Sequence, residues 1–167
     1  MKELPVRKGM RLEGFDYSGN GAYFITMCVK DGHEMLGKVS VDVGARIARP
    51  SLSKAGVIVE DAIHNVSQIY PSVLVDKYVI MPNHVHLILI IQDSFSCATP
   101  NNGRAMRAPT ISRLINQMKG HVTKQLGYSI WQKLFHDRII RDEAEYRHIW
   151  KYVDENPARW AEDKYHV

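Results

Sequence analysis

The sequence predicts an α+β fold, in which an antiparallel sheet is covered by helices. Two observations predict it. Several short segments are rich in β-branched and aromatic residues, as strands are, and longer segments between them repeat apolar residues at helical spacing. Their order is strand, strand, helix, strand, strand, helix, strand, helix. Such an order favours an antiparallel-dominated sheet with helices packed on it.

The composition is typical of a globular protein. The 167 residues are expected to form a single domain, 1–167, that is long enough to bury a core. Hydrophobic residues make up 45% of the chain and charged residues 24%. The formal net charge of +4 favours a polyanionic partner only mildly, so charge alone does not decide for nucleic acid.

The cysteines and the apolar runs indicate in which compartment the protein is expected. Cys28 and Cys97 are too few and too far apart for a disulfide framework, which favours a reducing environment. No uncharged apolar run reaches the roughly 20 residues that a membrane span needs. Residues 1–11 lack the apolar stretch of a signal peptide. We therefore expect a cytoplasmic protein that does not bind membranes.

The first part of the chain predicts strands. Residues 1–20 are polar and are expected to form an N-terminal arm. The aromatic and β-branched segment 22–29 predicts a first strand. Asp31-Gly32 is a hairpin turn signal that leads into a second strand at 34–41. A further short strand is expected at 46–50.

One helix and two strands follow. Ser51 or Ser53 is expected to cap a helix that ends before Pro71, and strands are expected at 73–81 and 84–92. The segment 93–108 has no periodicity and predicts a flexible loop. The apolar stripe of the first helix consists of Ala55, Val59, Ala62, Val66 and Ile69.

The last part of the chain predicts a helix, a strand and a helix. Thr110 is a good N-cap for a helix, and a strand is expected near 134–141 before Asp142 opens the last helix. The stripe of the first of these helices consists of Ile111, Leu114, Ile115, Met118, Val122 and Leu126; that of the last consists of Tyr146, Ile149, Trp150 and Val153.

A turn and two histidines lie between the strands at 73–81 and 84–92. Pro82-Asn83 predicts the turn. Side chains alternate along a strand, so His84 and His86 are expected to share one face and Val85 the other. Both faces are apolar further along, which predicts a central strand covered on both sides. The pair is either a metal-binding site or two structural histidines near a turn.

A second candidate site lies on the last helix. Tyr152 falls outside the predicted apolar stripe, and Asn156, four residues later, is on the same flank. Pro157 disfavours further helix at that point. Turn chemistry alone would explain Asn156-Pro157, with Tyr152 as a surface tyrosine, so the residues by themselves leave both interpretations open.

Taken together, these motifs resemble the HUH-type single-tyrosine transposases, and most of all their REP-associated tyrosine transposase branch. The resemblance spans nearly the whole chain. Only the segments 93–108 and 45–53 are not distinctive, so no preference for a DNA sequence is transferred. It rests on Met81-Pro82-Asn83-His84-Val85-His86, Tyr152 and Asn156-Pro157-Ala158-Arg159-Trp160, with Arg11-Leu12, Phe15-Asp16-Tyr17, Tyr23-Phe24-Ile25-Thr26, Trp131-Gln132, His136-Asp137 and Ile139-Ile140-Arg141-Asp142-Glu143.

The resemblance implies a ferredoxin-like core and assigns the site. It implies that Tyr152 is the nucleophile, that His84 and His86 are metal ligands, and that Asn156 is a third ligand. Attack by Tyr152 on a DNA phosphorus would give a 5′-phosphotyrosine and a free 3′-OH, which permits strand transfer without ATP. Imidazoles with oxygen donors suit a divalent metal, Mg or Mn in the first place.

The expected partner is single-stranded or hairpin DNA, bound by a monomer or a homodimer. Exposed basic residues would contact its backbone, although for each of them a solvated surface charge is the simpler interpretation. These candidates are Arg104, Arg107, Arg113, Lys119, Lys124, Arg138, Arg141 and Arg159.

Two other functions are compatible with the sequence. A module that binds DNA or RNA hairpins without cleaving them would have the same fold, but it would have no physical reason to keep His84, His86, Tyr152 and Asn156 together. A metal hydrolase that uses water as its nucleophile would leave Tyr152 without a role.

Overall fold

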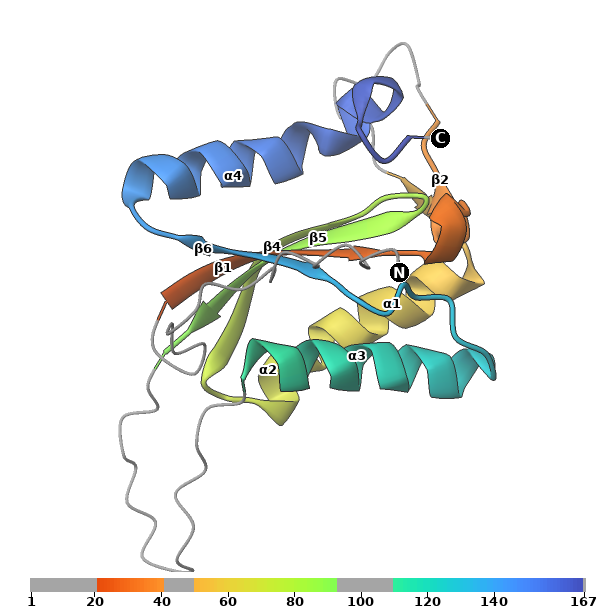
Figure 1. Cartoon of the computed structure of the whole chain (residues 1–167), viewed down its shortest axis with the longest axis horizontal. Coiled ribbons are helices and arrows are strands. Elements are labelled where there is room, and N and C mark those ends of the chain that lie inside the picture. Colours follow the sequence, from red (N-terminus) through yellow and green to blue (C-terminus); the bar gives the residue numbers. More distant parts are fainter. Residues whose placement is uncertain (1–20, 41–49, 93–109, 167) are drawn as a thin grey trace, which may run out of the picture.

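The computed structural model describes residues 21–40, 50–92 and 110–166, and its centre is a four-stranded sheet (Figure 1). The strand order is β4-β5-β1-β6, and every neighbouring pair is antiparallel. The first main strand therefore lies between the third and the fourth, which is the ferredoxin-like arrangement and confirms the predicted α+β fold. The strands are β1 (Gly21–Cys28), β4 (Val73–Ile80), β5 (His84–Ile91) and β6 (His136–Ile140).

Helices cover both faces of this sheet (Figure 1). On one face lie α1 (Lys54–His64), α2 (Val66–Ile69) and α3 (Ile111–Leu126). On the other lies α4 (Glu143–Glu155), followed by the 3-10 segment η2 (Asn156–Glu162). The sheet is thus the middle one of three layers.

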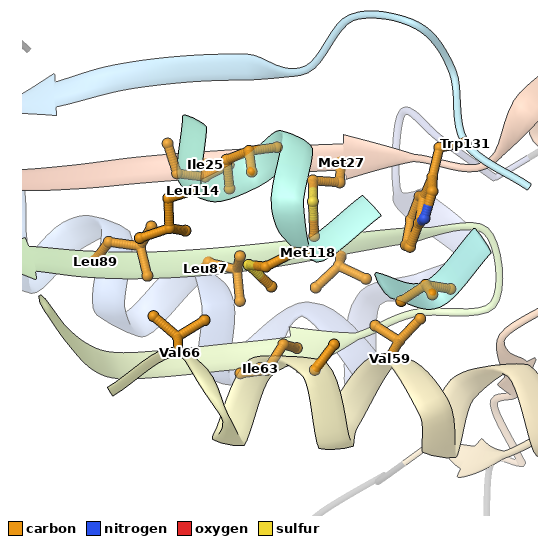
Figure 2. Close-up of a cluster of buried hydrophobic side chains, with 14 of the residues drawn as sticks. Ile25, Met27, Val59, Ile63, Val66, Leu87, Leu89, Leu114, Met118 and Trp131 are labelled. Atoms are coloured by element: carbon orange, nitrogen blue, oxygen red, sulfur yellow. The ribbon is translucent and has the colours of Figure 1, made fainter. Parts of the chain in front are cut away.

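The layer with α1 and α3 contains the larger hydrophobic core (Figure 2). Alternate residues of β5, Val85, Leu87 and Leu89, point into it together with Ile25 and Met27 of β1. Each aliphatic side chain of this size contributes about 1.5–3 kcal/mol when it is fully buried. This face of the sheet is therefore the main source of stability. The helices contribute Val59, Ile63, Leu114 and Met118.

The layer with α4 encloses a second, smaller core. Ile88 of β5 packs there with Val79 of β4, and Ile149 and Val153 of α4 close it from above. His84 and His86 alternate with the residues of the larger core, so they belong to this second face, as the strand periodicity predicts.

The predicted helix starts are confirmed by their caps. The Ser53 hydroxyl accepts a hydrogen bond from the Gly56 amide at 3.1 Å, and the Thr110 hydroxyl accepts one from the Arg113 amide at 3.3 Å. The Asp142 carboxylate accepts from the Glu145 amide at 2.8 Å. Each side chain satisfies an amide that the first helical turn leaves without a partner.

Two local predictions in the first half were wrong. Asp31 and Gly32 do turn the chain with positive φ angles of 57° and 72°, but β1 forms no hairpin with β2 (Gly37–Lys38). Both edges of β1 are already paired, with β5 and β6, and β2 pairs instead with β3 (Ser51–Leu52).

The second local error concerns the first helix. It was predicted to continue through Ile69, but it breaks at Asn65 into α1 and α2. Ile69 is 61% exposed and leaves the apolar stripe.

Some predictions lie outside the described residues. They are the arm at 1–20, the loop at 93–108 and most of the short strand at 46–50. Among the residues that the structure describes, no helix is both long enough and apolar enough for a bilayer crossing.

Candidate active site

His84 and His86 stand at the beginning of β5, directly after the Pro82-Asn83 turn. Their side chains are 0% and 1% exposed, and their ring centroids lie 4.6 Å apart. Across the strand pair, His84 is opposite Cys28 and His86 is opposite Thr26 of β1. The two imidazoles are therefore fixed side by side on a rigid inner strand.

Asn83 determines which nitrogen of His84 carries the proton. Its amide nitrogen donates to the carbonyls of Gly32 at 3.1 Å and Tyr165 at 2.6 Å, which fixes the orientation of the amide. Asn83 Oδ1 then lies 2.8 Å from His84 Nδ1, and an amide oxygen can only accept. Nδ1 must therefore donate, so the lone pair of the neutral ring is on Nε2.

His86 makes two polar contacts. Its Nδ1 is 2.8 Å from the Thr26 hydroxyl, and its Nε2 is 3.3 Å from the Tyr152 hydroxyl. Thr26 thus orients the ring from the sheet side, as partners of metal-binding histidines commonly do.

Both histidines are held neutral. Burial lowers the pKa of His84 to about 4, although the Asp163 carboxylate opposes the shift. Burial also lowers the pKa of His86 well below its usual value, and the neighbouring His84 adds to that effect. Neutral imidazoles are the form that binds metals.

The phase of α4 differs from the predicted one. Trp150 was expected in the apolar stripe, but it is 38% exposed, and the Lys77 ammonium lies 3.7 Å above its ring. The residues that face the sheet are Ile149, Tyr152, Val153 and Asn156. The sheet-facing side of α4 is therefore rotated relative to the predicted apolar stripe. This rotation turns Tyr152 from the flank of the helix toward His86.

Tyr152 is half-buried between aromatic rings. Phe24 of β1 meets it edge-on, with centroids 6.1 Å apart at 86°. Burial first, and then the negative charge of Asp163, raise its pKa to about 12. At neutral pH the free hydroxyl is therefore protonated and needs help to act as a nucleophile.

Asn156 lies one helical turn beyond Tyr152 and is 2% exposed. Its amide nitrogen donates to Asp163 Oδ2 at 2.7 Å. Its Oδ1 is buried and has no hydrogen-bond partner, and the same is true of His84 Nε2. The Asn156 side chain opposes the effect of burial on both neighbours: it raises the pKa of His84 and lowers the pKa of Tyr152.

Asp163 is the residue that sequence reasoning missed. One ligand atom each from His84, His86 and Asp163 lie within 4.8 Å of one another, and no other such group of His, Cys, Asp or Glu occurs among residues 21–40, 50–92 and 110–166. Asp163 follows η2, where Arg159 departs from helical geometry. No local pattern marks it, because only this turn brings it back to the histidines.

The donor atoms fit a divalent cation. Two buried acceptors, His84 Nε2 and Asn156 Oδ1, have no proton donor, and an unpaired buried polar atom costs about 1–3 kcal/mol. A cation would satisfy both of them. Two imidazole nitrogens with oxygen donors suit Mn or Mg when further oxygens come from substrate and water.

The predicted basic contacts are spread over the molecule. Arg113 and Lys124 are exposed on α3, in the layer away from the histidines. Lys119 is buried, and its ammonium donates to the carbonyls of Gln132 at 2.9 Å and Leu134 at 3.1 Å, which gives it a structural role instead.

The remaining basic candidates differ in position. Arg138 is exposed on β6 and pairs with Glu145. Arg141 and Arg159 are exposed near the two ends of α4. Arg104 and Arg107 lie outside the described residues.

Comparison with known proteins finds a relative by sequence and similar solved structures. No family model matches it. An uncharacterized protein of Haemophilus influenzae is 31% identical over 174 residues, which cover 96% of this chain and 93% of that protein. A REP-associated tyrosine transposase, solved with a REP hairpin bound, superposes with a TM-score of 0.60 at 20% identity. That match covers 86% of this chain and 70% of the transposase.

A candidate transposase from Deinococcus radiodurans gives a TM-score of 0.46 at 15% identity, over 90% of this chain and 97% of that one. The chain therefore belongs to the same family as the Haemophilus influenzae protein and has the fold of a REP-associated tyrosine transposase.

Proposed function

We propose that this protein is a metal-dependent endonuclease and transposase for single-stranded DNA, which cuts and rejoins its substrate through a phosphotyrosine. One observation carries the proposal. The Tyr152 hydroxyl lies 3.3 Å from His86 Nε2, beside two buried acceptors that have no donor. A candidate nucleophile and a set of metal-binding donor atoms thus meet in a fold that is shared with a REP-associated tyrosine transposase.

The reaction exchanges one phosphoester for another. The Tyr152 oxygen forms a bond to phosphorus and loses its proton, while the bond from phosphorus to the 3′ oxygen breaks and that oxygen takes up a proton. The 3′-OH of a second strand reverses the exchange and releases Tyr152. The number of phosphoester bonds is conserved, so no nucleotide triphosphate is consumed.

His84, His86 and Asn156 are the residues that would hold the cation. Asn83 directs the His84 lone pair to Nε2, and Thr26 holds the ring of His86. A bound divalent cation would supply Lewis acidity toward the scissile phosphate. The protein keeps both rings neutral and preorders the donors, so little reorganisation is needed on binding.

The substrate is proposed to be single-stranded DNA next to a hairpin. The structural neighbour was solved with a REP hairpin bound, and an unpaired phosphate can reach a half-buried tyrosine more easily than one in a duplex. Arg138, Arg141 and Arg159 remain the candidates for backbone contacts in the layer of α4. Tyr152 and the histidines belong to one chain, so we propose that a single subunit can cleave.

The test is formation of a covalent adduct with labelled hairpin oligonucleotides, followed by denaturing electrophoresis. Wild-type protein with Mg or Mn should give the adduct, and Tyr152→Phe or a chelator should abolish it. Tyr146→Phe is the matched control, because this tyrosine is on the same helix but its hydroxyl donates to Asp76 at 2.5 Å on the surface.

Other outcomes would contradict the proposal. An adduct formed by Tyr152→Phe would assign the nucleophile elsewhere. Cleavage without any adduct, retained in Tyr152→Phe, would indicate a hydrolase that activates water. Binding of hairpins without cleavage or adduct, unaffected by loss of both histidines, would indicate a binding module for DNA or RNA.

A further inference from the structure

We propose that Asp163 supplies a carboxylate ligand to the cation at His84 and His86. This inference deepens the proposed function, and it rests on that proposal for the presence of a metal. Neither the motifs of the sequence nor the resemblance points to this residue. It places a ligand in the segment after η2, outside the helix that carries Tyr152 and Asn156.

The distances are close to those of a metal site. Mg and similar ions bind nitrogen and oxygen ligands at about 2.0–2.2 Å, so two ligands of one ion lie about 3–4 Å apart. The candidate atoms of His84, His86 and Asp163 are already within 4.8 Å of one another. Small side-chain rotations would bring them to bonding distance.

The Asp163 carboxylate is also held in place. Its Oδ2 accepts from the Asn156 amide at 2.7 Å, and its Oδ1 accepts from the Tyr165 backbone amide at 2.7 Å. A carboxylate has about four lone-pair positions, so each oxygen retains capacity for a further partner. Carboxylates that bind metals are commonly oriented by such hydrogen bonds.

The charge of Asp163 is an independent reason to expect it as a ligand of the cation. The two histidines are almost fully buried, and an uncompensated charge in such surroundings is costly. Asp163 is the acidic residue that the described part of the chain places within ligand distance of both rings. Its negative charge would offset part of the charge of a divalent cation, which neutral donors cannot do.

Asn156 acquires a second role in this arrangement. Its nitrogen positions Asp163, which leaves Oδ1 free to face the site. Tyr165 also contacts the site. Its ring lies 4.5 Å from that of His84, and its carbonyl accepts a hydrogen bond from the Asn83 amide nitrogen at 2.6 Å. The segment after η2 is therefore hydrogen-bonded to Asn83, which orients His84, and to Asn156.

The experiment measures Mn²⁺ binding without DNA, from the loss of the electron paramagnetic resonance signal of the free ion. Asp163→Ala should lower the affinity by more than about 10-fold, the lower end of what even an indirect metal contact is worth. Asp163→Asn should also weaken binding, because it removes the charge. Glu162→Gln is the matched control: it removes an exposed neighbouring charge and should bind as the wild type does.

A Co²⁺ spectrum separates a lost ligand from a loosened segment. At saturating Co²⁺, Asp163→Ala should change the visible absorption bands if the carboxylate is a ligand. The inference is overturned if His84→Ala abolishes Mn²⁺ binding while Asp163→Ala binds like Glu162→Gln, or if the saturated spectrum of Asp163→Ala equals that of the wild type. Failure of the wild type itself to bind Mn²⁺ would overturn the proposed function as well.

Discussion

The two faces of β5 show how one strand serves two purposes. Val85, Leu87 and Leu89 point into a core that three helices cover, whereas His84 and His86 point toward α4, η2 and the segment after η2. The first residues of β5 thus alternate between polar side chains on one face and hydrocarbon packing on the other. The apolar face fixes the position of the strand, and this allows the other face to keep polar atoms without partners.

The comparison predicts that truncation lowers the free energy of unfolding more on the apolar face of β5 than on the histidine face. Leu87→Ala should lower the free energy of unfolding by about 2–5 kcal/mol, since it opens a cavity in the larger core. His84→Ala should cost less than about 2 kcal/mol, because it also removes a buried nitrogen without a partner. Urea unfolding of the metal-free proteins measures both values.

The same two variants should differ in the reverse order in Mn²⁺ affinity, with the larger loss in the histidine variant. His84→Ala should abolish binding, and folded Leu87→Ala should bind as the wild type does. The division between the faces would be wrong if Leu87→Ala lost its metal while it remained folded.

A pH titration sharpens the comparison, because the α4 face contains two buried histidines, whose pKa values burial lowers. The unfolded chain protonates His84 near pH 6.5, whereas burial keeps its pKa at about 4 in the folded protein. The unfolded state therefore binds more protons between these values. Stability should be complete above pH 6.5 and fall as the pH drops, by about 3 kcal/mol from His84 at pH 4.

Urea unfolding of the metal-free protein between pH 7 and pH 4 tests this, and His84→Ala should show a smaller decrease. An equal decrease in both proteins would mean that His84 is not the group responsible.

The smallest expected effect concerns the orientation of His84. Asn83→Ala removes the acceptor that holds the proton on Nδ1, so the ring can place a proton on the nitrogen that should bind metal. Mn²⁺ affinity should fall by about 10- to 100-fold, as for other groups that orient metal ligands. Asn83→Asp keeps an oxygen acceptor for Nδ1 but loses the donor to the Gly32 and Tyr165 carbonyls, so its affinity should fall less than that of Asn83→Ala. Equal losses in both variants would argue for a purely structural role of Asn83.

The sequence predicted β5 and its two faces because the information is local. Strict alternation after a Pro-Asn turn determines which side His84 occupies, whatever the rest of the fold does. The helix caps at Ser53, Thr110 and Asp142 were predictable for the same reason, since a cap depends on residues three positions apart.

The errors arose where partners are distant in sequence. The turn at Asp31-Gly32 was recognised, but its strand partner depends on β5 and β6 having already paired with β1. The phase of α4 was misjudged because Trp150 counts as apolar, while its ring is covered from outside by Lys77. Lys119 looked like a surface cation, but its carbonyl partners lie in the segment after α3.

The position of Tyr152 has a consequence for partly unfolded forms of the protein. Its hydroxyl meets an imidazole 66 residues earlier in the chain, and α4, which brings it there, covers the smaller core. Opening of a protein begins where the fewest apolar contacts are lost, so α4 should detach before the sheet melts. A partly opened molecule would then retain its pair of histidines on the sheet without Tyr152 beside them, so the site would come apart before the fold does.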